Sequence, residues 1–178
     1  MPEAPPLAGR LPARLLWLLL SASVVVLDQV TKAAVVARIP LHAQVAVIPG
    51  FFDLTHVQNT GAAFGLFASF DAAWKAAALN LVALAVFAGV LVFSLRSPAG
   101  LLRLQLALSL VLGGAVGNLV DRVRLGSVTD FLLFYVGRHQ WPSFNVADSA
   151  ITVGVALLAW DFWRNPAPEA DPAPPVER

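Results

Sequence analysis

Cysteine and charge are what this chain of 178 residues lacks. It contains no cysteine, which excludes disulfide bonds, a thiol nucleophile and cysteine-ligated metal sites. Only 13% of its residues are charged, about half of the ~25% found in an average soluble domain. Most of the surface must therefore face something other than water. The net charge of +1 gives no case for nucleic-acid binding.

Long apolar runs fill the chain instead. Hydrophobic residues make up 58% of it, and the mean hydropathy is +0.72. A helix that crosses the hydrocarbon core of a bilayer needs about 20 mostly apolar residues. Four runs have this character: about 13–36, 72–95, 101–120 and 147–163. The first follows basic residues, as in a signal peptide, but three more runs come after it, so we interpret it as a retained helix.

The sequence thus predicts an α-helical integral membrane protein with four transmembrane helices in one membrane-embedded domain, residues 1–164. Residues 165–178 are rich in proline and acids, which is typical of a disordered tail. Segment 42–66 is expected to form a small sheet or hairpin at the membrane surface, because Pro49-Gly50 separates two stretches with β-strand character. Arginines and lysines near the helix ends divide almost equally between the two sides of the membrane. Their count therefore does not predict on which side the termini lie.

Charged residues interrupt the first apolar run. Asp28 and Lys32 are four residues apart, so they share one face of the helix and can form an ion pair. A charge at the bilayer centre costs about 2.5–3.5 kcal/mol on insertion scales, and less near a helix end. Two interpretations stay open: a simple helix-end anchor, or a pair that shapes a site.

The third run ends in LGGAVGNLVDR. Its Gly113 and Gly117 form a GxxxG motif, which lets another helix approach closely. Asn118, Asp121 and Arg122 follow at helical spacing and lie on one face. Helix packing capped by a surface ion pair is one interpretation of this stretch, and a functional site is the other.

In NTGAAFG, residues 59–65, Gly61 permits a positive φ or a close backbone approach. Asn59 beside it can present its amide to a bound peptide backbone. An ordinary turn is the alternative interpretation of this stretch.

The last helix begins with FNVADS, where Ser143 or Asn145 is the expected N-cap. Asp148 then falls in the first turn, a place where the helix dipole alone favours an acid. Asp130, in TDFLLF, lies among apolar residues, which is unusual for an acid in a surface loop.

The sequence gives little support for a serine nucleophile or for a zinc protease. Ser127 and Ser149 lie neither in a GxSxG motif nor beside a histidine, and the chain contains no HExxH. Two aspartates that face each other across a water can share one proton. The ionised one then deprotonates water while the protonated one donates to the carbonyl or the leaving amine. This chemistry needs no metal, and the sequence permits Asp130 and Asp148 to form such a pair.

Five blocks in order resemble the lipoprotein signal peptidases, also called signal peptidase II. They are DQVTK (28–32), NTGAAFG (59–65), GGAVGNLVDR (113–122), GSVTDF (126–131) and FNVADS (144–149). Each block is weak by itself, but the ordered set is highly specific and spans almost the whole chain except both tails.

The resemblance implies an aspartyl endopeptidase of the bacterial cytoplasmic membrane, with no cofactor or metal. Such enzymes remove the signal peptide from a prolipoprotein just before a cysteine that carries diacylglyceryl. The implied catalytic pair is Asp130 and Asp148. The positions implied to line the substrate pocket or to support the site are Asp28, Lys32, Asn59, Asn118, Asp121, Arg122 and Asn145.

The family fold implies four helices, a small sheet and a short surface helical element. It also implies cytoplasmic termini and an active site near the outer leaflet. Nothing in the sequence requires more than a monomer.

One inference goes beyond the resemblance. Asp148, near a helix N-terminus, should be favoured as the carboxylate, whereas Asp130, with apolar neighbours, should be the one kept protonated. We therefore expect Asp148 to be the base and Asp130 the acid in the resting state.

Two rival interpretations remain at this point. A small ion-coupled transporter would also carry intramembrane Asp, Asn, Lys and Arg, but its polar groups should extend to mid-depth rather than gather near one face. A non-enzymatic adaptor would have lost one of the two aspartates, and both are present.

Overall fold

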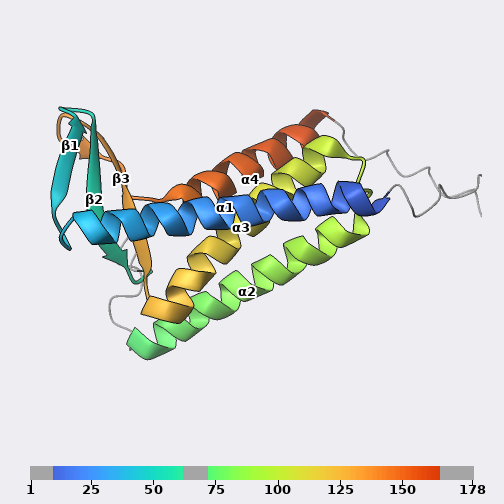
Figure 1. Cartoon of the computed structure of the whole chain (residues 1–178), viewed down its shortest axis with the longest axis horizontal. Coiled ribbons are helices and arrows are strands. Elements are labelled where there is room, and N and C mark those ends of the chain that lie inside the picture. The colour runs from blue at the N-terminus through green and yellow to red at the C-terminus, as the bar shows by residue number, and fades with distance from the viewer. Residues whose placement is uncertain (1–9, 62–71, 165–178) are drawn as a thin grey trace, which may run out of the picture.

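Four helices and a four-stranded sheet make up the described part of the protein (Figure 1). The structure is a computed structural model, and it describes residues 10–61 and 72–164. Three helices lie close to the expected ranges: α1 (Arg10–Arg38), α2 (Ala72–Arg96) and α4 (Val146–Arg164). The expected tail 165–178 and residues 62–66 of the expected β segment lie outside the described residues. Within those residues, no short surface helix is found.

Helix α3 (Leu102–Leu125) runs five residues past the expected end near Val120. It stops where Gly126 adopts a left-handed conformation with φ of 72° and donates its N–H to Arg122 O at 3.0 Å. Glycine favours this C-terminal cap because it has no Cβ to clash. The extension keeps Asp121 and Arg122 on the helix.

Three of the four helices are long and apolar enough to span a membrane: residues Ala13–Arg38 of α1, all of α3 and all of α4. The apolar segment found in α2, Asn80–Arg96, is shorter. α3 is the central helix, since 67% of its apolar window is buried against 11% for α1 and for α4. The other three helices pack around it, and large apolar side chains of α1, α2 and α4 point outward.

Helices α1 and α3 touch at the expected GxxxG motif. A Cβ on Gly113 would lie 2.7 Å from the carbonyl oxygen of Ser21, and one on Gly117 would lie 2.7 Å from Asp28 Oδ2. Both distances are far below van der Waals contact, so only glycine lets the helices come this near. The close approach expected from the sequence is confirmed.

The sheet has the order β1-β2-β3-β4, with antiparallel neighbours throughout: β1 (Gln44–Ile48), β2 (Phe52–Asn59), β3 (Val128–Val136) and β4 (His139–Gln140). The expected β1–β2 hairpin is confirmed, and Gly50 in its turn has a φ of 82°. The expectation that 42–66 supplies the sheet was incomplete, because β3 follows α3 directly and pairs with β2. Apart from Thr129 and Asp130, β3 is apolar on both faces, so it shows no alternation that would reveal a strand.

An apolar cluster fastens the sheet to one end of the bundle. Val35 in the last turn of α1 and Ile39 directly after the helix bury against Phe131 of β3, and Leu54 and Val146 pack around them. The cluster therefore joins α1, the sheet and the start of α4, and Figure 1 shows the sheet at that end of the helices.

The packing of α4 on α3 gives a test that avoids the sheet end. A Cβ on Gly154 would lie 2.7 Å from the carbonyl oxygen of Ala107 and 2.7 Å from Val111. Gly154→Ala is expected to lower the free energy of unfolding by about 1–3 kcal/mol, as overpacking does. Thermal unfolding of the purified protein in detergent measures the change.

Gly89→Ala in α2 is the matched control, since a Cβ there meets nothing within 4 Å. This variant should keep or raise the wild-type midpoint, because alanine is the better helix former by about 1 kcal/mol. Equal midpoints for Gly154→Ala and Gly89→Ala would contradict the close α3–α4 packing.

Candidate active site

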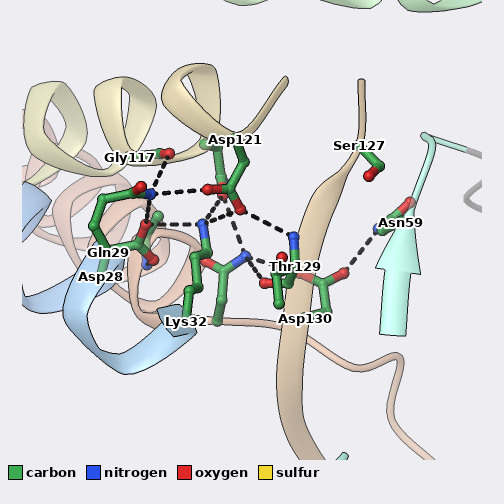
Figure 2. A network of polar contacts seen from close by, with 12 residues as sticks. Asp28, Gln29, Lys32, Asn59, Gly117, Asp121, Ser127, Thr129 and Asp130 are labelled. Atoms are coloured by element: carbon green, nitrogen blue, oxygen red, sulfur yellow. Dashed lines mark hydrogen bonds and ion pairs between the residues drawn. The ribbon is translucent and has the colours of Figure 1, made fainter. Parts of the chain in front are cut away.

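The polar residues singled out from the sequence gather where the helix bundle meets the sheet. They come from five elements that are far apart in the chain. Figure 2 shows part of this network, with α1 and α3 on one side and β2 and β3 on the other. The residues are Asp28 and Lys32 (α1), Asn59 (β2), Asn118 and Asp121 (α3), Asp130 (β3), and Asn145 and Asp148 at the start of α4.

A buried ammonium group is the centre of the network. Lys32 Nζ lies 2.8 Å from Asp28 Oδ2 and 3.0 Å from Asp121 Oδ2, and all three residues are at most 4% exposed. The expected Asp28–Lys32 pair is therefore confirmed. A helix-end anchor is wrong, because the lysine does not reach out of the protein. A surface ion pair of Asp121 is wrong too, because Asp121 is buried and pairs with Lys32.

Asp28 uses its second oxygen to hold a different helix. Asp28 Oδ1 accepts the backbone N–H of Ala147, in the first turn of α4, at 2.9 Å. The first N–H groups of a helix have no partner within the helix, and an acid there also interacts favourably with the helix dipole. Asp28 thus fixes the start of α4 against α1.

Sequence reasoning missed two residues of this network. Gln29 Nε2 donates to Asp121 Oδ1 at 2.9 Å and to the carbonyl of Gly117 at 3.1 Å. Thr129 contributes its backbone N–H, which donates to Asp121 Oδ2 at 3.0 Å. An amide inside an apolar run was a usable signal for Gln29. A backbone N–H leaves no signal in a sequence.

Asn145 is the N-cap of α4, one of the two expected candidates. Its Oδ1 accepts the backbone N–H of Asp148 at 2.9 Å, and Asp148 Oδ2 accepts the backbone N–H of Asn145 at 3.3 Å. This reciprocal pair is a capping box. It fixes the position of the Asp148 carboxylate in the first turn of the helix.

The side-chain amide of Asn145 also reaches the other aspartate. Asn145 Nδ2 donates to Asp130 Oδ1 at 2.8 Å, so one asparagine contacts both Asp130 and Asp148. Asn59 Nδ2 donates to Asp130 Oδ2 at 3.0 Å, and Asn118 Nδ2 donates to Asp148 Oδ1 at 2.7 Å. Each carboxyl group therefore sits among neutral amide donors.

Asn118 connects the two aspartates to the buried ion pairs. Its Oδ1 accepts a hydrogen bond from Lys32 Nζ at 3.1 Å and one from Asn145 Nδ2 at 3.2 Å. Because the oxygen is fixed in this way, the Nδ2 of the same amide must point to Asp148. Lys32 is thus linked to Asp148 through a neutral amide.

Burial raises the pKa of the Asp130 carboxyl from 3.8 to about 6. The hydrogen bond from Asn59 opposes this shift, the nearby charge of Asp148 adds to it, and the hydrogen bond from Asn145 opposes it again. Desolvation disfavours the charged form of an acid, which is why the proton stays on to higher pH. The direction agrees with the expectation that Asp130 is the protonated partner.

In the described part of the chain, four further residues considered from the sequence donate no hydrogen bond to either aspartate carboxyl. Gly61 has a φ of 81° and donates its N–H to Asn59 Oδ1 at 2.8 Å, so it orients the Asn59 amide. Arg122 is half-buried on the last turn of α3. Ser127 Oγ donates to Gln58, and Ser149 Oγ donates to the carbonyl of Asn145.

Known proteins resemble this chain in sequence over most of its length. The family model for signal peptidase (SPase) II matches residues 20–164. A lipoprotein signal peptidase of Pseudomonas putida is 46% identical over 161 residues, which cover 90% of this chain and 93% of that protein. One of Symbiobacterium thermophilum is 48% identical over 144 residues, 81% of this chain and 91% of that protein.

Solved structures resemble the fold as well. A bacterial membrane enzyme determined by the in meso method at 1.9 Å resolution superposes with a TM-score of 0.74 and 31% identity, over 84% of this chain and 93% of that one. Another, at 2.3 Å resolution, has a TM-score of 0.74 and 29% identity. These matches and the apolar helices make the protein a bacterial membrane protein, and the chain belongs to the signal peptidase II family of proteases.

Proposed function

We propose that the protein is an aspartyl endopeptidase that removes signal peptides from diacylglyceryl-modified prolipoproteins, cutting just before the lipidated cysteine. One observation carries the proposal: Asn145 donates to both carboxyl groups, from Nδ2 to Asp130 and from its backbone N–H to Asp148, and so brings them to one place. The relatives named lipoprotein signal peptidase support the substrate class. No cofactor takes part in the reaction.

In the first step Asp148, as the carboxylate, removes a proton from a water molecule. The water oxygen bonds to the carbonyl carbon of the scissile peptide while Asp130 donates its proton to the carbonyl oxygen. The pKa of Asp130, about 6, supports its role as the acid. The position of Asp148 at a helix N-terminus supports its role as the base.

In the second step the tetrahedral intermediate breaks its C–N bond. Asp148, which now holds a proton, gives it to the amine of the lipidated cysteine as that amine leaves. Asp130 takes back the proton of the hydroxyl as the carbonyl reforms, so both groups return to their starting states. The two carboxyls exchange roles of acid and base between the steps, as in other dyads.

The remaining polar residues position the reacting groups or the substrate. Asn118 and Asn145 orient the two carboxyls, and Asn59 and Arg122 face substrate at the edge of the site. The buried set of Asp28, Lys32 and Asp121 holds α1, α3, α4 and β3 together beneath them.

The protein works across the membrane as a single domain formed by residues 1–164, and as a monomer. α2 is the fourth crossing, since its 25 residues span about 37 Å at 1.5 Å per residue. The termini and the tail 165–178 lie in the cytoplasm, and the sheet lies at the outer leaflet. The polar network joins α1 and α3 to the starts of β3 and α4, at the end of the bundle where Figure 1 shows the sheet, and this position argues against a transporter.

Loss of either carboxyl tests the catalytic pair. Asp130→Asn and Asp148→Asn are each expected to lower cleavage at least ~10³-fold, within the range that general acid–base groups contribute. The assay follows the gel shift of a diacylglyceryl-modified prolipoprotein with purified enzyme. Asp53→Asn is the control, since Asp53 is another buried aspartate of the sheet, which accepts a hydrogen bond from Tyr135 at 3.0 Å. Full cleavage by either variant would remove that aspartate from the chemistry.

The pH dependence of kcat/KM tests the assignment of acid and base. Because the pKa of Asp130 is raised to about 6, its proton is present below that pH and is lost above it. An enzyme that needs this proton should lose activity as the pH rises through about 6. Asn59→Ala removes a hydrogen bond that stabilises the charged form, so the alkaline limb should move to higher pH. A limb that stays in place would contradict Asp130 as the group that titrates.

Lys32 is expected to matter for stability as well as for geometry. Lys32→Met keeps an unbranched apolar side chain of nearly the same length but leaves Asp28 and Asp121 buried without their cation. Breaking a buried ion pair in this way typically costs about 3–5 kcal/mol. The thermal midpoint in detergent should therefore fall steeply, and Lys32→Met with Asp121→Asn should recover part of the loss. Arg124→Met, at an exposed residue of α3, is the control that should change little.

A further inference from the structure

A cavity lies between α1, α2 and α3 at the end of the bundle opposite the sheet. Its volume is about 460 Å³, and Leu18, Leu91, Leu95 and Leu112 are among the residues that line it. Pockets that hold small ligands measure ~300–1,000 Å³. Ser21, the lining residue of α1 nearest in sequence to Asp28, is seven residues from it, which corresponds to about 10 Å of helix. The lining includes none of the residues of the polar network, so the cavity is separate from the two aspartates.

The lining of the cavity suits hydrocarbon better than water. Leucines provide much of its wall. Two of its hydroxyls are engaged with the protein itself: Ser21 Oγ donates to the carbonyl of Ser109 at 3.0 Å, and Ser94 Oγ donates to Gln105 Oε1 at 2.9 Å. The O–H groups of these serines are therefore used within the protein, and the leucine wall offers a water few of the two to four polar partners that it needs.

The cavity opens sideways within the apolar part of the bundle. Leu18 is 57% exposed and Leu95 is 52% exposed, although both line it. They belong to apolar helices, α1 and α2, each of which packs on α3. In a membrane, the molecules that meet such an opening are lipids.

A guanidinium group stands at the mouth. Arg14, in the second turn of α1, lines the cavity and donates from Nη2 to the carbonyl of Leu95 at 2.9 Å. Arginine has five N–H donors in a planar fork, and this contact uses one of them. Arg96, Arg103 and Arg164 lie exposed at the same end of the bundle. The mouth is therefore complementary to an anionic head group.

We propose that the cavity binds an anionic phospholipid of the leaflet on this side, with an acyl chain between the helices and the phosphate on Arg14. From Arg14 to Ser21 the lining residues of α1 extend over about 10 Å, a third of the ~30 Å hydrocarbon core. Trp17, between them, donates its indole N–H to the carbonyl of Ala99 at 3.1 Å. Tryptophan favours this depth, where hydrocarbon meets the head groups.

Lipid titration followed by native mass spectrometry tests the proposal. Delipidated protein is titrated with phosphatidylglycerol and, in parallel, with phosphatidylcholine of the same acyl chains. The expected result is one tightly bound phosphatidylglycerol per chain and weaker binding of phosphatidylcholine. Equal binding of both lipids would overturn the proposal. A lipid-free dimer in the mass spectrum would overturn it as well, because a second copy of the chain would then cover the cavity.

Two pairs of variants locate the site. Arg14→Gln should weaken phosphatidylglycerol binding about fivefold, as expected for one arginine near anionic lipid, whereas Arg96→Gln, outside the lining, should change it less. Leu91→Trp should fill the cavity and abolish tight binding, whereas Leu84→Trp, on a lipid-facing leucine of the same helix, should not. Equal effects within either pair would place the lipid elsewhere on the protein and refute the cavity.

Photo-crosslinking of the wild type removes any dependence on how the variants fold. Phosphatidylglycerol with a diazirine in its acyl chain should label residues 15–21 of α1 and 91–95 of α2. Label spread evenly over the outer faces of α1, α2 and α4 would mean bulk lipid only and would overturn the proposal. Loss of prolipoprotein cleavage is not a readout here, so the proposed peptidase activity and the lipid site can fail independently.

Discussion

The buried ammonium group of Lys32 is the interaction on which the rest of the site depends. Each partner of Lys32 also forms a hydrogen bond with another element. Asp28 binds the first turn of α4, Asp121 binds the start of β3, and Asn118 binds Asp148. Charges in a medium of low dielectric are costly unless they are paired and hydrogen-bonded. The three helices and the strand are therefore bound to one relative position.

That network requires an unusually close approach of two helices. The carboxylate of Asp28 lies where the side chain of any residue larger than glycine at position 117 would lie. The GxxxG motif thus does more than pack α1 on α3, because it lets a charged group of one helix rest against the backbone of the other. Gln29 of α1 also contacts α3 at this point, because it donates a hydrogen bond to the carbonyl of Gly117. The close packing of α1 on α3 and the polar contacts between them therefore depend on each other.

The two aspartates meet neutral amides rather than cations. Asn59, Asn118 and Asn145 contact them, while Lys32 stays one amide away. A cation in direct contact would favour the charged form of a carboxyl and lower its pKa, which would drive off the proton that the proposed reaction needs. The amides orient the carboxyl groups, and although the hydrogen bonds from Asn59 and Asn145 also favour the charged form of Asp130, burial outweighs them. Burial can then raise the pKa of Asp130 to about 6.

The sequence by itself determined the local features: the apolar helices, the hairpin at 44–59, the i, i+4 pair of Asp28 and Lys32, and an N-cap of the last helix at Ser143 or Asn145. Each depends on residues within a few positions of one another, so spacing and side-chain chemistry suffice. The tertiary structure alone decided that β3 pairs with β2, that Asp121 turns to Lys32 and not to Arg122, and that Asn145 spans both aspartates. These contacts join residues distant in the chain, and they depend on how closely the helices pack.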